Sequence, residues 1–256
     1  MRLLTPKFIY RLYERKLSSE IRSKPIPKHI GIILDGNRRA SKMLGVDYKT
    51  GYELGADKLE EVLDWCWELD VKVITCWVFS TENFSRPDDQ VKSIMKLAID
   101  NLRKIREDKR IYKNQVKVKV LGRLNLLPEN VQEEIKLTEN ATKMHDNFIL
   151  NICMAYGGRA EIVDALKRIL DKVKGGNIDF DDIDEELISN HLYTNGLSDP
   201  DLIIRTSGEE RLSGFLLWQS AFSEYYFAEV HWPLFRRIDL WRAIRTYQRR
   251  QRRYGS

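Results

Sequence analysis

The chain has 256 residues, of which 43% are hydrophobic and 32% charged, and it carries a formal net charge of +5. This composition excludes an intrinsically disordered chain, and no apolar run approaches the roughly 20 residues that a membrane-spanning helix needs. The three cysteines, Cys66, Cys76 and Cys153, have no CxxC spacing, which favours buried, reduced thiols in a cytoplasmic protein.

The first expected element is a basic, amphipathic helix over residues 7–22, which Pro25 and Pro27 bring to an end. Such a helix could pack on the protein core, on a partner or on a membrane surface, and its sequence does not distinguish among these sites. We expect residues 1–24 to form an N-terminal extension that carries this helix. No linker or repeat interrupts residues 25–256, so we expect them to form one domain.

Segments typical of strands and of helices alternate along this domain. Strands are expected at residues 29–34, 71–79, 116–120, 148–154, 201–204, 215–218 and 225–230. Helices are expected at residues 53–69, 89–109, 128–144 and 160–173, and around 240–247. This alternation favours a single α/β domain with a largely parallel central sheet flanked by helices.

The turn after the first strand reads Asp35-Gly36-Asn37-Arg38-Arg39. Free N–H groups at the start of a helix bind anions, glycine lets the backbone come close, and arginine grips phosphate oxygens in pairs. A carboxylate fits such an anion site when a divalent cation links it to the anion. Taken alone, however, the segment could equally be an ordinary Asp-Gly turn after a buried strand.

Three further strands end in polar turns, at residues 80–86, 156–159 and 205–213. Ligands of parallel sheets bind beyond the carboxyl ends of the strands, so we expect these four turns to meet on one rim. The rim would carry five arginines and few acids: Arg38, Arg39, Arg86, Arg205, Arg211, Asp35 and Glu224. Such a site suits a polyphosphate with Mg²⁺, which takes one or two protein carboxylates together with substrate phosphates.

Familiar alternatives lack their motifs, because no GxxxxGK[ST], GxGxxG, HExxH or GxSxG pattern occurs. The four histidines, at positions 29, 145, 191 and 231, show no ligand spacing and are assigned packing or surface roles. The acidic residues 181–185 are interpreted as the first turn of a helix rather than as a metal site. Another class of phosphate-binding enzyme, or a nucleic-acid binder acting through the basic residues 236–256, stays open at this point.

Five motifs, taken in order, resemble those of the cis-prenyltransferases, also called undecaprenyl or polyprenyl diphosphate synthases. They lie at residues 29–38, 79–87, 156–159, 201–219 and 253–255. The resemblance runs from about His29 to the C-terminus, outside residues 1–24. It implies that residues 25–256 are a catalytic domain with an apolar tunnel for a growing chain. It also implies a homodimer without a nucleic-acid partner, and a cytoplasmic location with peripheral contact at the inner face of the cell membrane.

The implied reaction is the repeated, Mg²⁺-dependent condensation of isopentenyl diphosphate onto an allylic diphosphate, either farnesyl or geranylgeranyl diphosphate. Its product would be a long polycis-polyprenyl diphosphate, the lipid-carrier precursor for glycan assembly. The resemblance implies that Asp35 and Asn83 are catalytic and that Asp35 and Glu224 bind Mg²⁺. It assigns the allylic diphosphate to Gly36, Asn37, Arg38, Arg39, Ser80, Phe84 and Arg86. It assigns isopentenyl diphosphate to Arg205, Arg211 and Ser213, with Arg253 and Gly255 completing the site of a partner subunit.

Some positions depart from the family pattern. Tyr48 and Tyr52 stand where many members have arginine and histidine, and Phe84 replaces a common tryptophan. The tyrosines fall near the expected allylic site, so the choice of primer stays open. Residues 89–108 and 148–154 are expected to line the tunnel, and the product length also stays open. The alternative function is a non-catalytic accessory subunit of a heteromeric cis-prenyltransferase, against which the retained arginine and metal positions argue.

Overall fold

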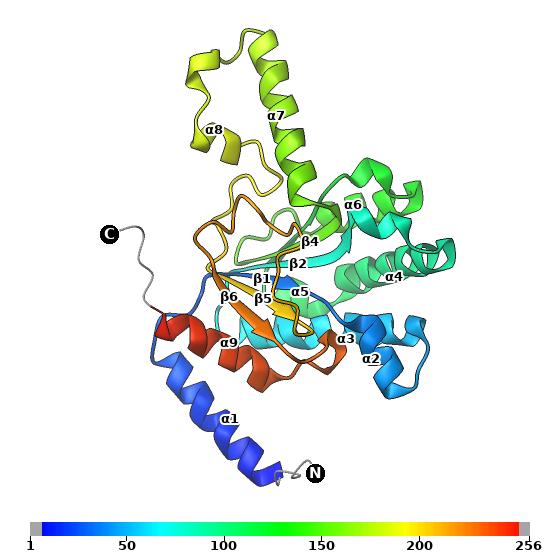
Figure 1. The fold of residues 1–256 in the computed structure, drawn as a ribbon, viewed down its shortest axis with the longest axis vertical. Coiled ribbons are helices and arrows are strands. Elements are labelled where there is room, and N and C mark those ends of the chain that lie inside the picture. The colour runs from blue at the N-terminus through cyan, green and yellow to red at the C-terminus, as the bar shows by residue number, and fades with distance from the viewer. Residues whose placement is uncertain (1–6, 251–256) are drawn as a thin grey trace.

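The structure is a computed structural model that describes residues 7–250, and its centre is one parallel β-sheet (Figure 1). Six strands in the order β3-β4-β2-β1-β5-β6 form the sheet, and every neighbouring pair is parallel. The strands are β1 (His29–Ile33), β2 (Val73–Ser80), β3 (Val116–Leu121), β4 (Phe148–Tyr156), β5 (Leu202–Thr206) and β6 (Glu224–Ala228). The predicted single α/β domain with a parallel sheet is thereby confirmed.

Helices connect the strands and cover the sheet (Figure 1). They are α1 (Lys7–Arg22), α2 (Asn37–Leu44), α3 (Tyr48–Trp67), α4 (Asp88–Glu107), α5 (Lys109–Lys113), α6 (Glu129–Thr142), α7 (Gly158–Lys174), α8 (Glu185–Ser189) and α9 (Arg237–Arg249). Both α3 and α4 start near the carboxyl end of one strand and lead to the amino end of the next. They therefore run beside each other along the height of the sheet. No helix among residues 7–250 combines the length and the apolar character that a membrane span requires.

The centre of the sheet is buried, as expected for parallel strands covered on both faces. A chain of polar side chains nevertheless crosses three strands. Asn151 Nδ2 donates to Thr75 Oγ1 at 2.9 Å, and Thr75 Oγ1 lies 2.8 Å from Nε2 of His29. His29 Nδ1 lies 2.6 Å from the carbonyl oxygen of Ser198. A neutral ring satisfies both contacts when Nδ1 carries the proton, so His29 has the predicted packing role.

Helix α1 packs against α9, so core packing is one of the three sites left open by its sequence that the structure shows (Figure 1). Leu17 and Ile21 of α1 are buried, and Glu20 forms an ion pair with Arg249 at 3.3 Å. The amide of Gln248 on α9 also donates to the carbonyl oxygen of Ile21 at 2.9 Å. Arginines of the basic C-terminal segment therefore contact acids of the same chain. The three cysteines are free and buried, as predicted.

The strand expected at residues 215–218 does not form. Phe215 and Leu216 are fully buried, but the backbone turns here, with φ of +51° at Ser213, +99° at Gly214 and +44° at Leu216. Phe215 inserts beneath the sheet's carboxyl end, where it stacks on Trp77 with ring centroids 5.5 Å apart. Burial without regular backbone explains the error, because a short apolar run alone does not separate a strand from a buried turn.

Candidate active site

A cavity of about 1430 Å³ lies between α3, α4 and the sheet, and opens at the carboxyl end of the strands. Three of the four predicted turns line it, at residues 35–39, 80–86 and 205–213, and these three turns are called the polar rim. The fourth turn, at residues 156–159, instead supports the rim from behind, because the N–H of Gly158 donates to the carbonyl oxygen of Gly214 at 2.7 Å. The rim contributes Asp35, Gly36, Asn37, Arg38, Arg39, Ser80, Asn83, Arg86, Arg205, Arg211 and Ser213 to the lining.

The turn from β1 into α2 presents bare backbone to this cavity. Gly36 is the N-cap of α2 with φ of +103°, and no side chain caps the helix. A Cβ at Gly36 would lie 2.5 Å from Oγ of Ser207, so only glycine fits. Thr206 Oγ1 and the N–H of Trp232 donate to the carbonyl oxygen of Asp35, at 2.7 and 3.0 Å. These two hydrogen bonds fix the turn, and the first N–H groups of α2 remain available to an anion.

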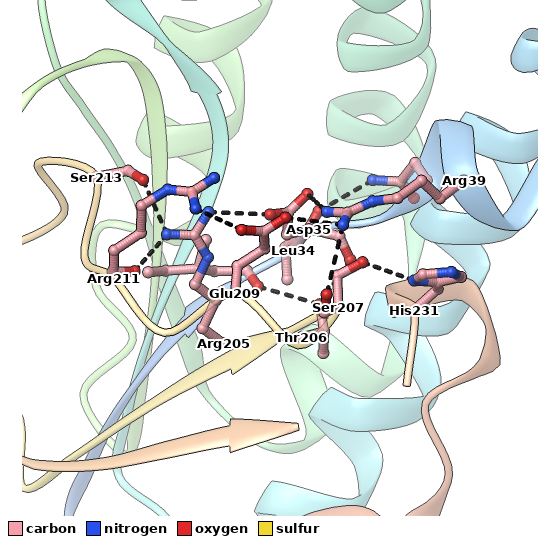
Figure 2. Close-up of polar contacts among 12 residues, drawn as sticks. Leu34, Asp35, Arg39, Arg205, Thr206, Ser207, Glu209, Arg211, Ser213 and His231 are labelled. Carbon is pink, nitrogen blue, oxygen red and sulfur yellow. Dashed lines mark hydrogen bonds and ion pairs between the residues drawn. The ribbon is translucent and has the colours of Figure 1, made fainter. Parts of the chain in front are cut away.

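The carboxylate of Asp35 lies between two guanidinium groups (Figure 2). Nη2 of Arg39 donates to Oδ1 at 3.1 Å, and Nη2 of Arg205 donates to Oδ2 at 3.0 Å. Burial raises the pKa of Asp35, but the hydrogen bonds and charges of Arg205 and Arg39 outweigh it and hold the pKa below its usual range. Asp35 is therefore ionised at neutral pH.

Arg205 is buried at the centre of the rim turn formed by residues 205–213. It is only 4% exposed, and its Nη1 donates to Ser213 Oγ at 2.8 Å and to the carbonyl oxygen of Arg211. Arg211 itself forms an ion pair with Glu209, whose other oxygen accepts from Nη1 of Arg39 at 2.8 Å (Figure 2). Glu209 is a rim residue that was not predicted from the sequence. Its place between Arg205 and Arg211 in the same turn was the only available signal.

The third turn of the rim, at residues 80–86, forms a short 3₁₀ helix, Thr81–Ser85. The N–H of Ser80 donates to Oδ1 of Asn83 at 3.2 Å, so the amide NH₂ of Asn83 remains for a ligand. Nη1 of Arg86 donates to the hydroxyl of Tyr52 at 3.2 Å, and burial lowers the pKa of Arg86. Arginine stays cationic at neutral pH even so, because its ordinary pKa lies far above neutrality.

Four predicted site residues are not brought to the rim, or cannot be placed there. Glu224 is the first residue of β6 and lies opposite Leu202, at the amino end of the sheet, where it forms an ion pair with Arg250 at 2.7 Å. The prediction that Glu224 joins Asp35 on the rim is therefore wrong within one chain. Phe84 does not line the cavity, because its ring packs edge-on against Phe79 at 4.9 Å. Arg253 and Gly255 lie outside the described residues.

The side chain of Asn37 does not face the rim, although an asparagine side chain could bind a ligand there. Its Nδ2 donates to the carbonyl oxygen of Leu34 at 3.0 Å, and its buried Oδ1 has no hydrogen-bond partner. That oxygen faces Gly55 of α3, where a Cβ would come within 2.2 Å of it. The side chain of Asn37 is therefore turned away from the rim, and this residue offers its backbone N–H to an anion.

The residues present fit Mg²⁺ bound jointly with a phosphate. Among residues 7–250, no three acidic, histidine or cysteine side chains gather into a cage that could hold a metal by themselves. Mg²⁺ commonly binds one or two carboxylates together with substrate phosphates, and Asp35 supplies one carboxylate beside the anion-binding turn. Its side chain is 29% exposed and that of Arg39 is 43% exposed, so a cation can replace this contact.

Below the rim the lining becomes apolar. Trp77, Phe79, Leu59, Leu63, Ile94, Leu97, Ala98, Leu102, Ile152 and Met154 contribute to it. Within the segments 89–108 and 148–154, which were expected to line a tunnel, the cavity is lined by Ile94, Leu97, Ala98, Leu102, Ile152 and Met154, and the prediction is confirmed at these positions. Val91, Met95 and Ile99 of α4 do not line the cavity. An anion-binding rim thus opens into a long apolar space.

The comparisons with known proteins agree with this geometry. The prenyltransferase family model for undecaprenyl diphosphate synthases matches residues 33–255. The chain is 51% identical over 257 residues to a geranylgeranyl-diphosphate-specific tritrans,polycis-undecaprenyl-diphosphate synthase of Methanocaldococcus jannaschii, covering 100% of this chain and 92% of that protein. It is 49% identical over 251 residues to an isoprenyl transferase of Thermus thermophilus, covering 96% of this chain and 95% of that protein.

Among solved structures, lavandulyl diphosphate synthase from Lavandula x intermedia, crystallised with dimethylallyl diphosphate, superposes with a TM-score of 0.87. It is 34% identical in sequence, and the match covers 93% of this chain and 100% of that one. The family match and these relatives span nearly the whole chain. The chain therefore belongs to the undecaprenyl diphosphate synthase family of prenyltransferases.

Proposed function

We propose that this protein is a Mg²⁺-dependent cis-prenyltransferase that condenses isopentenyl diphosphate repeatedly onto geranylgeranyl diphosphate. Its product would be a long polycis-polyprenyl diphosphate that serves as a lipid-carrier precursor. The observation that carries the proposal is Asp35, held between Arg39 and Arg205 at the mouth of a long apolar cavity. The choice of primer rests on the relatives that are named as specific for geranylgeranyl diphosphate.

The two halves of the rim would bind the two diphosphates. The start of α2, with Arg38, Arg39 and Arg86, offers N–H groups and cations to the allylic diphosphate. Arg205, Arg211 and Ser213 offer a second, separately fixed set of donors to isopentenyl diphosphate. Mg²⁺, held by Asp35, would neutralise charge on the departing diphosphate. This arrangement would bring the two reacting ends side by side at the cavity mouth.

In the reaction, the C–O bond of the allylic diphosphate breaks and its electron pair leaves with the diphosphate. The double bond of isopentenyl diphosphate attacks the allylic cation, a new C–C bond forms, and a proton is lost to give the new double bond. The rim arginines stabilise the charge that develops on the leaving diphosphate. The walls at Trp77 and Phe79 keep water from the cation, and the lengthened chain moves into the cavity.

The direct test is incorporation of labelled isopentenyl diphosphate by the purified protein, with C10, C15 and C20 allylic diphosphates offered separately. We expect long labelled lipid, most of it from the C20 primer, that disappears on chelation of Mg²⁺ and in the Asp35→Ala variant. Absence of product with every primer would overturn the proposed function and point to the accessory-subunit alternative. A better yield from the C15 primer would overturn the choice of geranylgeranyl diphosphate alone.

We also propose that the active form is a homodimer in which Arg253 and Gly255 of one subunit complete the isopentenyl diphosphate site of the other. The support is the motif match that the C-terminal residues share with the family. Mixing inactive Asp35→Ala and Arg253→Ala subunits tests it, because a mixed dimer would contain one intact site. Recovery of activity on mixing is expected. No recovery, despite proven subunit exchange, would contradict shared sites.

Peripheral contact with a membrane is a further part of the proposal. Helix α1 carries Ile9 and Leu12, which are 51% and 49% exposed although Leu17 and Ile21 of the same helix are buried. Such a half-buried helix can present an apolar strip to lipid. Co-sedimentation with anionic vesicles should weaken in an Ile9→Ser, Leu12→Ser double variant. Unchanged sedimentation would count against contact through α1.

A further inference from the structure

The end of the cavity farthest from Asp35 is lined by charged side chains beside the apolar side chains of Trp67, Ile105 and Ile111. Helices α3 and α4 run from the rim towards the amino end of the sheet, so their C-terminal halves lie at the far end of the cavity. The lining there includes Glu60 of α3, Lys104 and Glu107 of α4, and Arg110 of α5. The cavity therefore has three zones, which are a polar rim, an apolar wall and a far end where charged side chains join the apolar lining.

Arg110 connects the two sides of this far end. Its Nη2 lies 2.9 Å from Oε2 of Glu60, and its Nη1 lies 2.7 Å from Oδ2 of Asp64, both on α3. Its Nε also donates to Oδ2 of Asp108, the residue between α4 and α5, at 2.8 Å. We call these four residues, Arg110, Glu60, Asp64 and Asp108, the Arg110 clasp. The clasp ties α3 to the junction of α4 and α5.

The clasp opposes the advance of an apolar chain for a physical reason. Each condensation adds five carbons at the diphosphate end, so the distal end of the product moves one unit deeper. Movement along the apolar wall is favourable because it buries hydrocarbon. At the clasp, further movement must part ion pairs or bury hydrocarbon against charged groups, which costs free energy.

The free-energy cost of opening the clasp is modest, because the clasp lies at the protein surface. The side chains of Arg110, Glu60 and Asp64 are 40–41% exposed, and ion pairs of such exposure are individually weak. One guanidinium nevertheless serves three carboxylates, so removal of Arg110 leaves three like charges facing one another. The far end would then lose its tie between α3 and α5 and open to solvent.

We propose that the Arg110 clasp closes the far end of the cavity and thereby sets the upper limit of product length. This inference rests on the proposed function, since it concerns the length of the chain that the enzyme makes. It assigns a specificity-determining role to residues that lie outside every motif that the sequence resemblance rests on. The clasp touches neither diphosphate subsite, so the first condensation should not depend on it.

The test compares the products of the wild type, of Arg110→Ala and of a Glu60→Gln, Asp64→Asn double variant. Each purified full-length protein receives geranylgeranyl diphosphate and labelled isopentenyl diphosphate, and the products are separated by length on reversed-phase plates. Arg123→Ala is the matched control, because Arg123 pairs with Asp164 at 2.9 Å on helix α7 and does not line the cavity. The rate of the first condensation is measured in parallel.

We expect the main product of both clasp variants to lengthen by at least one C5 unit, with a first-condensation rate within about twofold of the wild type. The control should keep the wild-type length. An unchanged length in a clasp variant that folds and turns over would overturn the clasp while leaving the proposed function intact. If the wild type makes no polyprenyl diphosphate, both proposals fail together. The double variant keeps the side-chain volumes, so it covers the case in which Arg110→Ala does not fold.

Discussion

At the scale of single residues, the site depends on how Asp35 is surrounded. Its two oxygens accept from Arg39 and Arg205, which come from α2 and β5. Arg205 is buried and already holds Ser213, whereas Arg39 is half-exposed and shared with Glu209. The two contacts therefore differ in strength. The Arg205 contact fixes the carboxylate, while the Arg39 contact can yield to a cation or a diphosphate.

Asp35→Asn tests this assignment without changing the shape of the side chain. The neutral amide can neither compensate Arg205 nor hold Mg²⁺, so we expect kcat/KM to fall about 100-fold or more. Steady-state kinetics across a Mg²⁺ titration measure the effect. If raised Mg²⁺ fully restored the rate, Asp35 would only strengthen metal binding, and its assigned part in the departure of the diphosphate would be wrong.

Tyr52 is a second residue with a testable consequence, because its side chain contacts an arginine of the rim. Its hydroxyl accepts from Arg86 on the rim at 3.2 Å. Loss of one such hydrogen bond costs about 1 kcal/mol, so Tyr52→Phe should raise KM for the allylic diphosphate about fivefold and leave KM for isopentenyl diphosphate unchanged. Tyr225→Phe is the control, since that hydroxyl bonds the carbonyl oxygen of Ser220 outside the cavity. Equal effects on both substrates would contradict a role through Arg86.

At the scale of elements, the junction of β1 and α2 makes the anion site. The strand ends where the chain must turn sharply, and Gly36 supplies the positive φ of that turn. The sequence shows this junction because glycine, asparagine and arginine follow an apolar run directly. It does not show that Thr206 and Trp232, from distant segments, hold the carbonyl oxygen of Asp35. Local chemistry is visible in a sequence, whereas support from another element is not.

The two glycines that flank α2 give a matched pair of variants. Gly36→Ala combines a positive φ of +103° with a contact of 2.5 Å to Ser207, whereas Gly45→Ala has a φ of +71° with nothing within 4 Å. Both should lose about 1–3 kcal/mol of unfolding free energy, because alanine disfavours positive φ. Only Gly36→Ala should also lose activity at temperatures where both proteins are folded. Denaturant unfolding measures the loss of stability in each variant, and turnover measures the loss of activity. A fully active Gly36→Ala variant would refute the anion-site geometry.

At the scale of the whole molecule, a parallel sheet brings chemistry from distant segments to one edge. The strand order β3-β4-β2-β1-β5-β6 places β1 between β2 and β5, so all three turns of the polar rim follow neighbouring strands. The same sheet carries the buried chain of Asn151, Thr75 and His29 through its centre. Desolvation by burial lowers the pKa of His29 from 6.5 to about 4, outweighing its hydrogen bond to Ser198.

This burial predicts a loss of stability in mild acid. Between pH 6.5 and about 4 the unfolded chain binds a proton at His29 that the folded protein does not, so the free energy of unfolding falls as the pH falls through that window. The loss from this group should reach about 2 kcal/mol between pH 7 and pH 5. Denaturant unfolding at several pH values measures it. A His29→Gln variant should lack this component, and an identical pH profile in that variant would contradict the assignment.

The sequence by itself determined the fold class and most of the chemistry of the site. Alternating strand and helix patterns predicted the parallel sheet, and the residue types at 35–39, 80–86, 156–159 and 205–213, together with their places at strand ends, marked these turns as phosphate-binding candidates. These features are visible because they depend on residues close together in the chain. A helix start, a glycine turn and a pair of arginines each act over a few positions.

Only the tertiary structure decided which of these residues meet. It placed Glu224 at the amino end of the sheet, turned the apolar run after Ser213 into a buried loop, and brought Glu209 between two arginines of the rim. It also joined Arg110 to Glu60 across the far end of the cavity. The physical reason is common to all four. Strand register, loop path and ion pairing are set by contacts between residues far apart in sequence, and such contacts leave no local pattern.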